Sequence, residues 1–315
     1  MKRRAVGKPR HNQQGAALII ALLLVTLLGI LVAELSHSVN VDARAVLNTG
    51  LDSQNTNAAL GGIQYAMAVL AELDDDTQCD TLDDEWAKVR RTEIGRAQVT
   101  IRLIDECSRL NINGLTPPNS DEGNELDRLA GALGLSAEHI GSEAADWADL
   151  DDKGPFEAGA PNRGFLCTGE LALLKGIDSS RLYGENGLAP YVTVWSDGKI
   201  NLNTASKEVL QAVLPEEDSD IADAIIERRK MEPFGKVAEL QTVSGLTGAV
   251  YQRLEKITCV AGSCFSVEST ASIGPMTRAV RAVVTRDKGE VQVIYLEEQP
   301  PVGALSPTGT GDADG

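Results

Sequence analysis

Four aspartates in the middle of the chain have the residue type and the close spacing that a metal site needs. Asp146, Asp149, Asp151 and Asp152 offer carboxylate oxygens in a short stretch that ends at Gly154. Ca²⁺ takes about 6–8 oxygen ligands, and aspartate is a common source of them. The spacing is not that of an EF-hand, so the prediction of a calcium site stands beside an equal alternative, a solvated acidic loop without an ion. No other cofactor is expected.

Five cysteines can form disulfide bonds if their part of the chain is exported to an oxidising compartment. Cys259 and Cys264 bracket a short Val-Ala-Gly-Ser link. Such a link can bring their Cα atoms within the reach of a disulfide, about 7 Å. We therefore predict a disulfide between these two residues. Cys79 and Cys107 are the next candidate pair, which leaves Cys167 free.

The sequence lacks the residue arrangement of a catalytic centre. No Ser-His-Asp or Cys-His arrangement occurs in a suitable context, and neither a phosphate-binding glycine loop nor a dinucleotide fingerprint is present. The three histidines, His11, His37 and His139, lie away from any cysteine cluster, which argues against a zinc site. The acids at Asp149, Asp151 and Asp152 could suggest carboxylate chemistry, but such residues are more commonly solvated loop residues than catalytic carboxylates. We predict that the protein is not an enzyme.

The balance of charge argues against nucleic-acid binding. The 315 residues carry a formal net charge of −17, and 43% of them are hydrophobic, enough to bury a core in about two domains. The first fifteen residues hold five basic groups and no acid, so the remainder has a net charge of −22. Binding to nucleic acid needs a basic surface that displaces counterions.

An apolar run near the N-terminus organises the rest of the chain. Ala16–Ala33 contains no charged residue, and as a helix it would be roughly 27 Å long, close to the roughly 30 Å of a bilayer core. The basic residues before it keep the N-terminus in the cytoplasm, which places the rest of the chain in the periplasm. Apolar residues continue at helical spacing to Leu73, so one long helix over 16–73 fits better than a cleaved signal peptide. An ordinary single-pass anchor is the other alternative.

Gly15 stands between the basic leader and the apolar run, and this junction resembles the cleavage site of type IV prepilins. In that class the leader is removed after the glycine, and the apolar helix is retained. The resemblance implies a leader of residues 1–15, cleavage between Gly15 and Ala16, and methylation. Most members carry a glutamate at the fifth mature position, where it neutralises the N-terminal amine of a neighbouring subunit. Here that position is Ile20, the pattern of one particular minor subunit.

Strand-like sequence occurs before and after a region of different texture. Residues 96–103 alternate polar and apolar side chains, as a half-buried strand does, and short Val- and Thr-rich stretches follow after residue 264. The fold class is therefore predicted as α+β, a long helix packed on an antiparallel sheet. The sheet domain would comprise 74–110 and 258–297, and the Pro- and Gly-rich residues 298–315 would be a disordered tail.

Residues 111–257, between the two parts of the sheet, contain an internal repeat. The Asn-x-Asn motif at Asn111 recurs at Asn201, and Gly164-Phe165 with its following Glu-Leu and Gly recurs from Pro233-Phe234 at the same offsets. Such self-similarity indicates two related units. We predict an inserted all-α domain of two helix-hairpin-helix-like repeats, with Asn203 or Thr204 capping the first helix of the second unit.

The repeat suggests an alternative function, because helix-hairpin-helix units commonly bind DNA. A membrane-tethered, extracytoplasmic DNA-binding protein would fit such a repeat. DNA-binding hairpins present backbone amides to a phosphate at a glycine-rich turn. The corresponding turn here is Leu214–Asp218, which holds three carboxylates. These would repel a phosphate.

In order along the chain, these features resemble the type II secretion system minor pseudopilin K family, also called general secretion pathway protein K. The resemblance covers nearly the whole chain up to Tyr295. It implies the pseudopilin fold and an inner-membrane protein at the tip of a periplasmic pseudopilus, where it caps the assembly and helps folded proteins cross the outer membrane. The implied partners are other minor pseudopilins, the major pseudopilin and the prepilin peptidase, and no nucleic acid. The motifs that carry it, besides the prepilin-like junction, are Asp146–Asp151, Pro161–Arg163 with Glu170-Leu171, Tyr191–Val194, Lys199–Ala205, and Pro233-Phe234 with Glu239-Leu240.

Overall fold

The computed structural model describes residues 13–73, 79–115, 124–135, 139–149, 154–156 and 159–299. The chain divides into two compact units, Met1–Gln54 and Asn55–Gly315. The first consists, where it is described, of the N-terminal part of helix α1 (Gln13–Glu72). The second contains the end of that helix, a sheet and a helical region.

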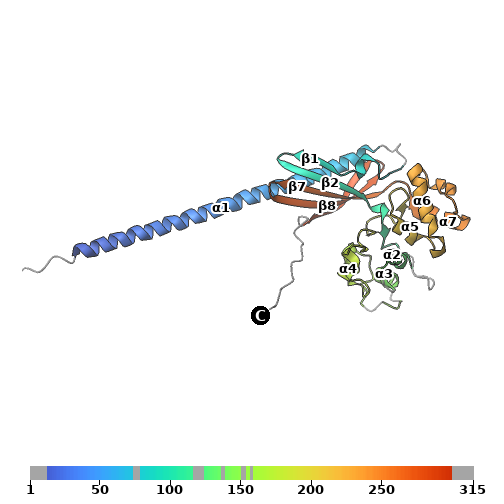
Figure 1. Ribbon diagram of the computed structural model, residues 1–315, viewed down its shortest axis with the longest axis horizontal. Coiled ribbons are helices and arrows are strands. Elements are labelled where there is room, and N and C mark those ends of the chain that lie inside the picture. The colour runs from blue at the N-terminus through green and yellow to red at the C-terminus, as the bar shows by residue number, and fades with distance from the viewer. Residues whose placement is uncertain are drawn as a thin grey trace, which may run out of the picture. The chain divides into compact units, whose positions relative to one another are not determined.

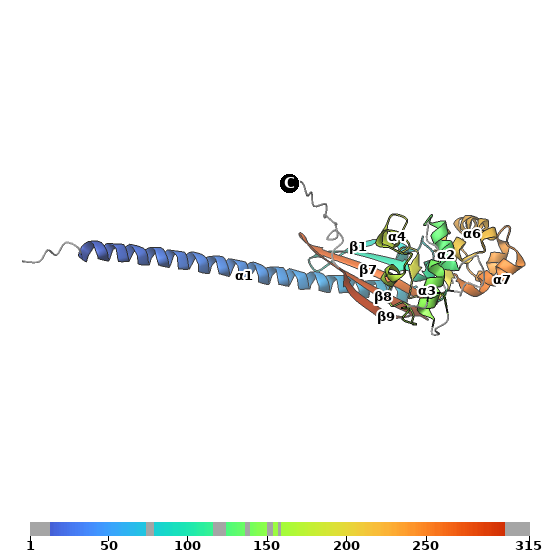
Figure 2. The same cartoon turned by 90° about the horizontal axis from the view of Figure 1, so that it is seen from below.

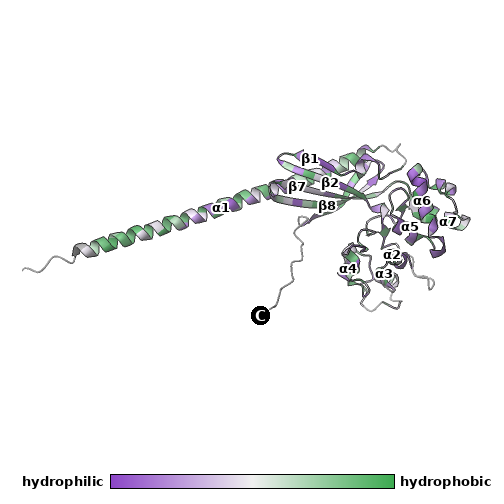
Figure 3. Cartoon of the chain, in the orientation of Figure 1, coloured by the Kyte–Doolittle hydropathy of each residue, from purple (hydrophilic) through white to green (hydrophobic). Residues whose placement is uncertain are grey.

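The N-terminal part of α1 is apolar around its whole circumference. Its leucine, isoleucine and valine side chains from Leu18 to Val32 are each about half exposed or more, and they form the continuous hydrophobic band of Figure 3. Among the residues that the structure describes, α1 alone is long and apolar enough to cross a membrane. Side chains that are apolar on all sides and exposed require an apolar solvent, which a bilayer supplies.

One antiparallel sheet forms the frame of the second unit. Its strand order is β1-β2-β7-β8-β9, and every neighbouring pair runs antiparallel. The pairing of β2 with β7 joins residues far apart in sequence, from Gln98 opposite Ser272 to Asp105 opposite Phe265. The edge strand β1 was not predicted from the sequence. The bounds are β1 (Arg90–Ile94), β2 (Ala97–Asp105), β7 (Cys264–Ile273), β8 (Met276–Asp287) and β9 (Glu290–Gln299).

The end of α1 packs on one face of this sheet. Side chains of β2 alternate between buried and more exposed, as the sequence pattern predicted, and the buried ones meet α1. Gly62 permits this close packing, since a Cβ there would lie 2.2 Å from the Ser269 hydroxyl and 3.1 Å from Val99. The core between helix and sheet includes Ala59, Ile63, Ala66, Leu70, Val99, Ile101 and Val267.

The region between β2 and β7 is mainly helical and lies at one end of the sheet (Figures 1 and 2). It has two successive sets of elements that share one order, two α-helices, a 3-10 helix and a third α-helix; the second set has an additional 3-10 helix between its first two α-helices. The third α-helix of each set was not predicted as a separate element. The first set is α2 (Glu125–Ala132), α3 (Ile140–Ala148), η3 (Thr168–Leu173) and α4 (Ser179–Tyr183). The second is α5 (Lys207–Val213), α6 (Asp220–Met231), η5 (Val237–Thr242) and α7 (Gly248–Ile257).

The prediction that the insert is all-α is incomplete, because each set also has a short parallel strand pair that joins its beginning to its end. In the first, β3 (Leu110–Asn111) pairs with β4 (Val192–Thr193). In the second, β5 (Ile200–Asn201) pairs with β6 (Thr258–Cys259). The two sets share one hydrophobic core, separate from that of the sheet, with Leu126, Leu129, Ile140, Leu171, Leu210, Ile225, Phe234 and Leu254 among its buried members. We call residues 111–257 the helical insert.

Candidate functional site: the junction of the helical insert and the sheet

A two-way asparagine clamp fixes each unit of the repeat. Asn113 donates from Nδ2 to the Phe165 carbonyl at 3.0 Å and accepts from the Phe165 amide at 2.7 Å. Asn203 makes the same pair of bonds to Phe234, at 3.0 and 2.9 Å. An amide side chain suits this role because it carries a donor and an acceptor side by side and can bond to the N–H and the C=O of one residue at once. The clamp explains why Asn and Phe recur together in the sequence.

The capping role predicted for Asn203 or Thr204 was wrong. Ser206 is the N-cap of α5, and its hydroxyl accepts a hydrogen bond from the Val209 amide at 3.3 Å. Asn203 is committed to Phe234, and the Thr204 hydroxyl donates to Asp105 at 2.7 Å. Asn203 and Thr204 are not available as caps, because their side chains form hydrogen bonds with distant residues.

Asp105, the last residue of β2, joins the sheet to the insert. Its Oδ2 accepts from the Asn201 side chain at 2.8 Å as well as from Thr204, and its Oδ1 accepts from the Cys107 amide at 2.8 Å. The side chain is almost completely buried, and burial raises the pKa of this carboxyl to about 6, although its three hydrogen bonds pull the pKa down. The end of one sheet strand is thus bonded to the start of the second repeat unit.

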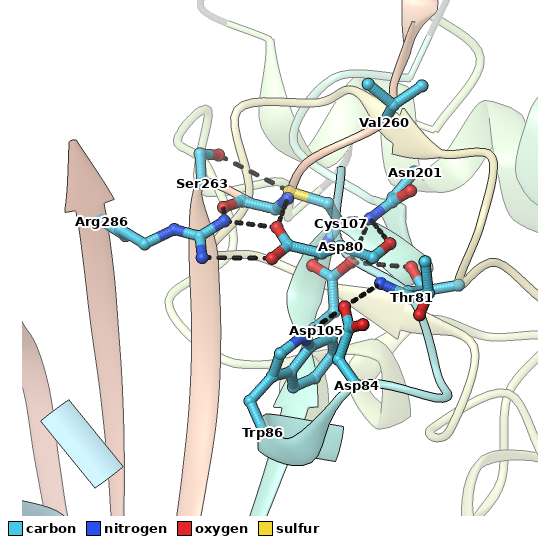
Figure 4. A network of polar contacts seen from close by, with 12 residues as sticks. Asp80, Thr81, Asp84, Trp86, Asp105, Cys107, Asn201, Val260, Ser263 and Arg286 are labelled. Atoms are coloured by element: carbon cyan, nitrogen blue, oxygen red, sulfur yellow. Dashed lines mark hydrogen bonds and ion pairs between the residues drawn. The ribbon is translucent and has the colours of Figure 1, made fainter. Parts of the chain in front are cut away.

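A buried ion pair forms the other half of the junction (Figure 4). Both guanidinium nitrogens of Arg286, on β8, contact the Asp80 carboxylate, with the Nη1–Oδ1 distance at 3.1 Å and the other contact shorter. The two side chains are 13% and 6% exposed. Asp80 Oδ2 also accepts from the Gly262 amide at 2.6 Å, and the Asp80 amide donates to the Val260 carbonyl at 2.8 Å. The segment leaving the insert is therefore held by residues from both ends of the sheet domain.

The junction consists of Asp80, Asp105, Asn201, Thr204, Gly262 and Arg286, and its groups are mutually satisfied. Each carboxylate accepts several hydrogen bonds at once, so the cluster positions chain segments and offers no free nucleophile. Asn201 belongs to the repeated motif and could have been singled out from the sequence. The contacts of Asp80 with Arg286 span 206 residues, and no local sequence signal indicates them.

The predicted leader cleavage site lies within α1, and most of the leader before it falls outside the described residues. Gly15 and Ala16 are exposed helical residues, and a Cβ added to Gly15 would meet no atom within 4 Å. Residues 1–12 of the leader lie outside the described part of the chain. Cleavage there stays a prediction.

Of the four aspartates of the predicted calcium site, the structure describes two. Asp151 and Asp152 lie outside the described residues. Asp146 is buried, and its Oδ2 accepts a hydrogen bond from the Phe156 amide at 2.7 Å. Asp149 follows the end of α3. Within the part of the chain that the structure describes, no group of three or more His, Cys, Asp or Glu side chains could hold a metal ion, so the calcium site also stays a prediction.

The five cysteines are free thiols in the structure, so the predicted bond between Cys259 and Cys264 is not formed there. The side chain of Cys259 instead interacts with that of Cys107, which lies just before the insert. The local pair was predicted from the short link between Cys259 and Cys264. Cys107 is 152 positions away from Cys259, and sequence spacing gives no information on such a contact.

The turn between α5 and α6 bears on the DNA-binding alternative. It contains the 3-10 helix η4 (Glu216–Asp218), whose Glu216 and Glu217 are exposed. These carboxylates lie just before the N-terminus of α6, where a DNA-binding hairpin would receive a phosphate. The charge at this turn therefore opposes phosphate binding.

Comparison with known proteins finds a family model that matches the second repeat unit and relatives that match most of the chain. A family model described as "Type II secretion system (T2SS), protein K" matches residues 200–256, which include β5 and the helices of the second repeat unit. A Pseudomonas aeruginosa protein named Type II secretion system protein K is 28% identical over 320 residues, covering 90% of this chain and 92% of that protein. Proteins of the same name from Klebsiella pneumoniae and Aeromonas hydrophila are 28% and 23% identical, covering 66% and 88% of this chain and 72% and 94% of their own lengths.

A solved structure shares the fold. The crystal structure of the GspK-GspI-GspJ complex from the enterotoxigenic Escherichia coli type 2 secretion system contains a chain that matches with a TM-score of 0.65 at 17% identity. The match covers 79% of this chain and 98% of that chain. The family model, the relatives along most of the length and the shared fold agree: this chain is similar to proteins of the type II secretion system protein K family.

Proposed function

We propose that this protein is the minor pseudopilin that caps the tip of a type II secretion pseudopilus and helps folded periplasmic proteins across the outer membrane. One observation carries the proposal: a helical insert of about 150 residues is placed between β2 and β7, at the end of the sheet. The chain acts by position and bulk, and we propose no catalytic step.

Growth of a pilus-like filament explains why such an insert matters. Subunits that pack head to tail make heterologous contacts, and these continue without limit unless something blocks the next position. The insert lies at the end of the sheet where α1 also ends, since Asp80, shortly after that helix, is bonded to Val260 and Arg286. A subunit with this bulk at one end is best accommodated at a terminus of the filament.

The N-terminal residues fit the same role. The apolar part of α1 would anchor the chain in the inner membrane, with the basic leader in the cytoplasm and the second unit in the periplasm. After cleavage by the prepilin peptidase, Ile20 would stand where other pilin-like chains have an acid. Without that acid the subunit cannot neutralise the amine of a neighbour, a loss that is tolerated where no such amine must be buried.

We propose that two other minor pseudopilins are its direct partners, and that the tip they form joins the major pseudopilin. The solved complex with the similar chain contains GspK, GspI and GspJ together, which supports this partner set. The helix face over residues 35–73 and the sheet are the surfaces expected to hold them. The test is co-purification of the tagged full chain with the other minor pseudopilins from detergent-solubilised membranes. The tagged major pseudopilin serves as the matched bait. Failure of both minor pseudopilins to accompany this chain would contradict the proposal.

The exposed thiol of Cys167, within the insert, allows the tip position to be tested directly. A maleimide-gold label on assembled pseudopili should appear at one end of each filament. A Cys167→Ser chain reports background labelling of the partly buried Cys79 and Cys259. Gold distributed along the shaft in wild-type filaments, and absent from the Ser variant, would refute capping.

Leader processing has an equally direct test. We expect Gly15→Leu to block conversion to the mature size, because a side chain at this position obstructs approach of a protease to the backbone. Gly7→Leu is the matched control within the same leader and should be processed. A mature-sized band from the Gly15 variant would show that cleavage does not occur there.

A further inference from the structure

Three cysteine side chains lie where the chain enters and leaves the helical insert. Cys107 is in the 3-10 helix η2 (Glu106–Ser108), directly after β2. Cys259 ends β6, and Cys264 begins β7. Cys107 and Cys264 are buried, whereas Cys259 is partly exposed. The two chain crossings between the sheet and the insert therefore each carry at least one thiol.

The hydrogen bonds around Asp105 bring Cys107 and Cys259 together. Asp105 accepts from the Cys107 amide and from the side chain of Asn201. Asn201 is in register with Cys259 across the parallel pair of β5 and β6, and the amide of Leu202 donates to the Cys259 carbonyl at 3.0 Å. One carboxylate thus fixes both backbone segments. Figure 4 shows Cys107 in the middle of this cluster, with its sulfur 3.5 Å from the Ser263 hydroxyl.

The two thiols also interact with each other. The interaction between the Cys107 and Cys259 side chains lowers the pKa of Cys107 and raises the pKa of Cys259. Burial raises the pKa of Cys264, the third thiol. Cys107 is therefore the sulfur that most readily becomes a thiolate, the form that attacks a disulfide.

We propose that Cys107 and Cys259 form a disulfide bond that ties the two crossings together at the base of the helical insert. The proposal rests on the periplasmic placement in the proposed function, because an oxidising compartment supplies the disulfide reagent. It also replaces the local pairing of Cys259 with Cys264 expected from sequence spacing.

The reaction balances as two successive thiol-disulfide exchanges. Cys259 makes the first attack because it is the one of the two that solvent reaches: it gives up its proton, attacks a low-molecular-weight disulfide, forms a mixed disulfide and releases one thiolate. The Cys107 thiolate then attacks the Cys259 sulfur and releases the second. The two cysteine protons pass to the two released thiolates. The cysteines together lose two electrons, and the reagent gains them.

The test uses the full chain purified in detergent and incubated with oxidised glutathione. Free thiols are then alkylated under denaturing conditions, and the unreduced peptides are mapped by mass spectrometry. We expect one linked pair, Cys107 with Cys259, and alkylation of the other three cysteines. A bond from either residue to Cys264, or alkylation of all five, would overturn the proposal. Because this arm needs no pseudopilus, its failure is separate from failure of the proposed function.

Two variants and a second sample sharpen the result. Cys264→Ser should retain the link, and Cys259→Ser should lose it. Chain taken directly from cell membranes, with thiols trapped by acid and alkylation, should already carry the same bond. A pair that links in detergent but is reduced in cells would overturn bond formation in the cell and the periplasmic placement together.

Discussion

The buried pair of Asp80 and Arg286 should hold the base of the helical insert on the sheet, and its removal should be costly. Replacing Asp80 by Ala leaves a guanidinium without its carboxylate in a nearly dry site and deprives the Gly262 amide of its acceptor. Breaking one side of a buried ion pair typically costs about 3–5 kcal/mol. Arg286 keeps a bond to the Gly262 carbonyl at 2.9 Å and its place over the Phe265 ring, so we expect the lower half of that range.

The double variant separates a true pair from two independent effects. Arg286→Met alone should also cost about 3 kcal/mol, because it leaves Asp80 buried and charged. The combination of Asp80→Ala and Arg286→Met should cost at least about 2 kcal/mol less than the sum of the single losses, as coupled neighbours do.

The measurement is guanidinium unfolding of the full chain in detergent, followed by tryptophan fluorescence. Trp86 packs edge-on to Phe265 with ring centroids 5.2 Å apart, so it reports on this end of the sheet. Glu227→Ala is the matched control, since its ion pair with Lys230 is 2.8 Å long but exposed, and about 0.5 kcal/mol or less is expected. Single losses no larger than the control, or additive losses in the double variant, would refute the reasoning.

Four further outcomes are expected. The pKa of Asp105 is raised from 3.8 to about 6 by burial, so the folded state binds more protons between these values. The free energy of unfolding should therefore fall as pH rises from about 4 to 6, by up to about 3 kcal/mol. If the free energy of unfolding of an Asp105→Asn chain depends on pH as that of the wild type does, this prediction is contradicted. Oxidation of Cys107 and Cys259 should raise the free energy of unfolding by roughly 5 kcal/mol in the chain-entropy account, because the loop exceeds 100 residues; equal denaturation midpoints with and without reductant would count against it. Asn203→Ala should cost about 2–4 kcal/mol by leaving the buried N–H and C=O of Phe234 unpaired, and unfolding curves that overlay wild type would exclude the clamp. The full chain should bind Ca²⁺ in equilibrium dialysis at millimolar concentration and lose it with Asp146→Asn, whereas no bound ion in wild type removes the site.

Local patterns in the sequence predicted the elements that are decided locally. The alternation in residues 96–103 predicted β2, and the uncharged run from Ala16 predicted the apolar part of α1. The repeated Asn-x-Asn motif indicated two related units, and Asn113 and Asn203 make the same clamp in each. For β2 and α1 the pattern depends only on which side chains face solvent, lipid or the core, and for the two units it depends on the repetition of the motif.

The sequence could not predict interactions whose partners are far apart in the chain. Ser206 caps α5 because Asp105 and Phe234 occupy the two residues that sequence rules favoured as caps. The contact between Cys107 and Cys259 follows from the pairing of β5 with β6, which no spacing rule contains. The junction as a whole depends on which strands are neighbours in the sheets, and the sequence does not show this.

The direct pairing of β2 with β7 makes the sheet independent of what lies between the two strands. Asp105 faces Phe265 across the ladder, so the chain leaves and re-enters the sheet at neighbouring positions. A hairpin loop of about 2–5 residues could span that gap. The region between β2 and β7 is thus an insertion at a position where a short hairpin loop would suffice. Residues can therefore be added to or removed from this connection without changing the pairing of β2 with β7, and in the proposed function the size of the connection is what separates a subunit that ends the filament from one that permits elongation.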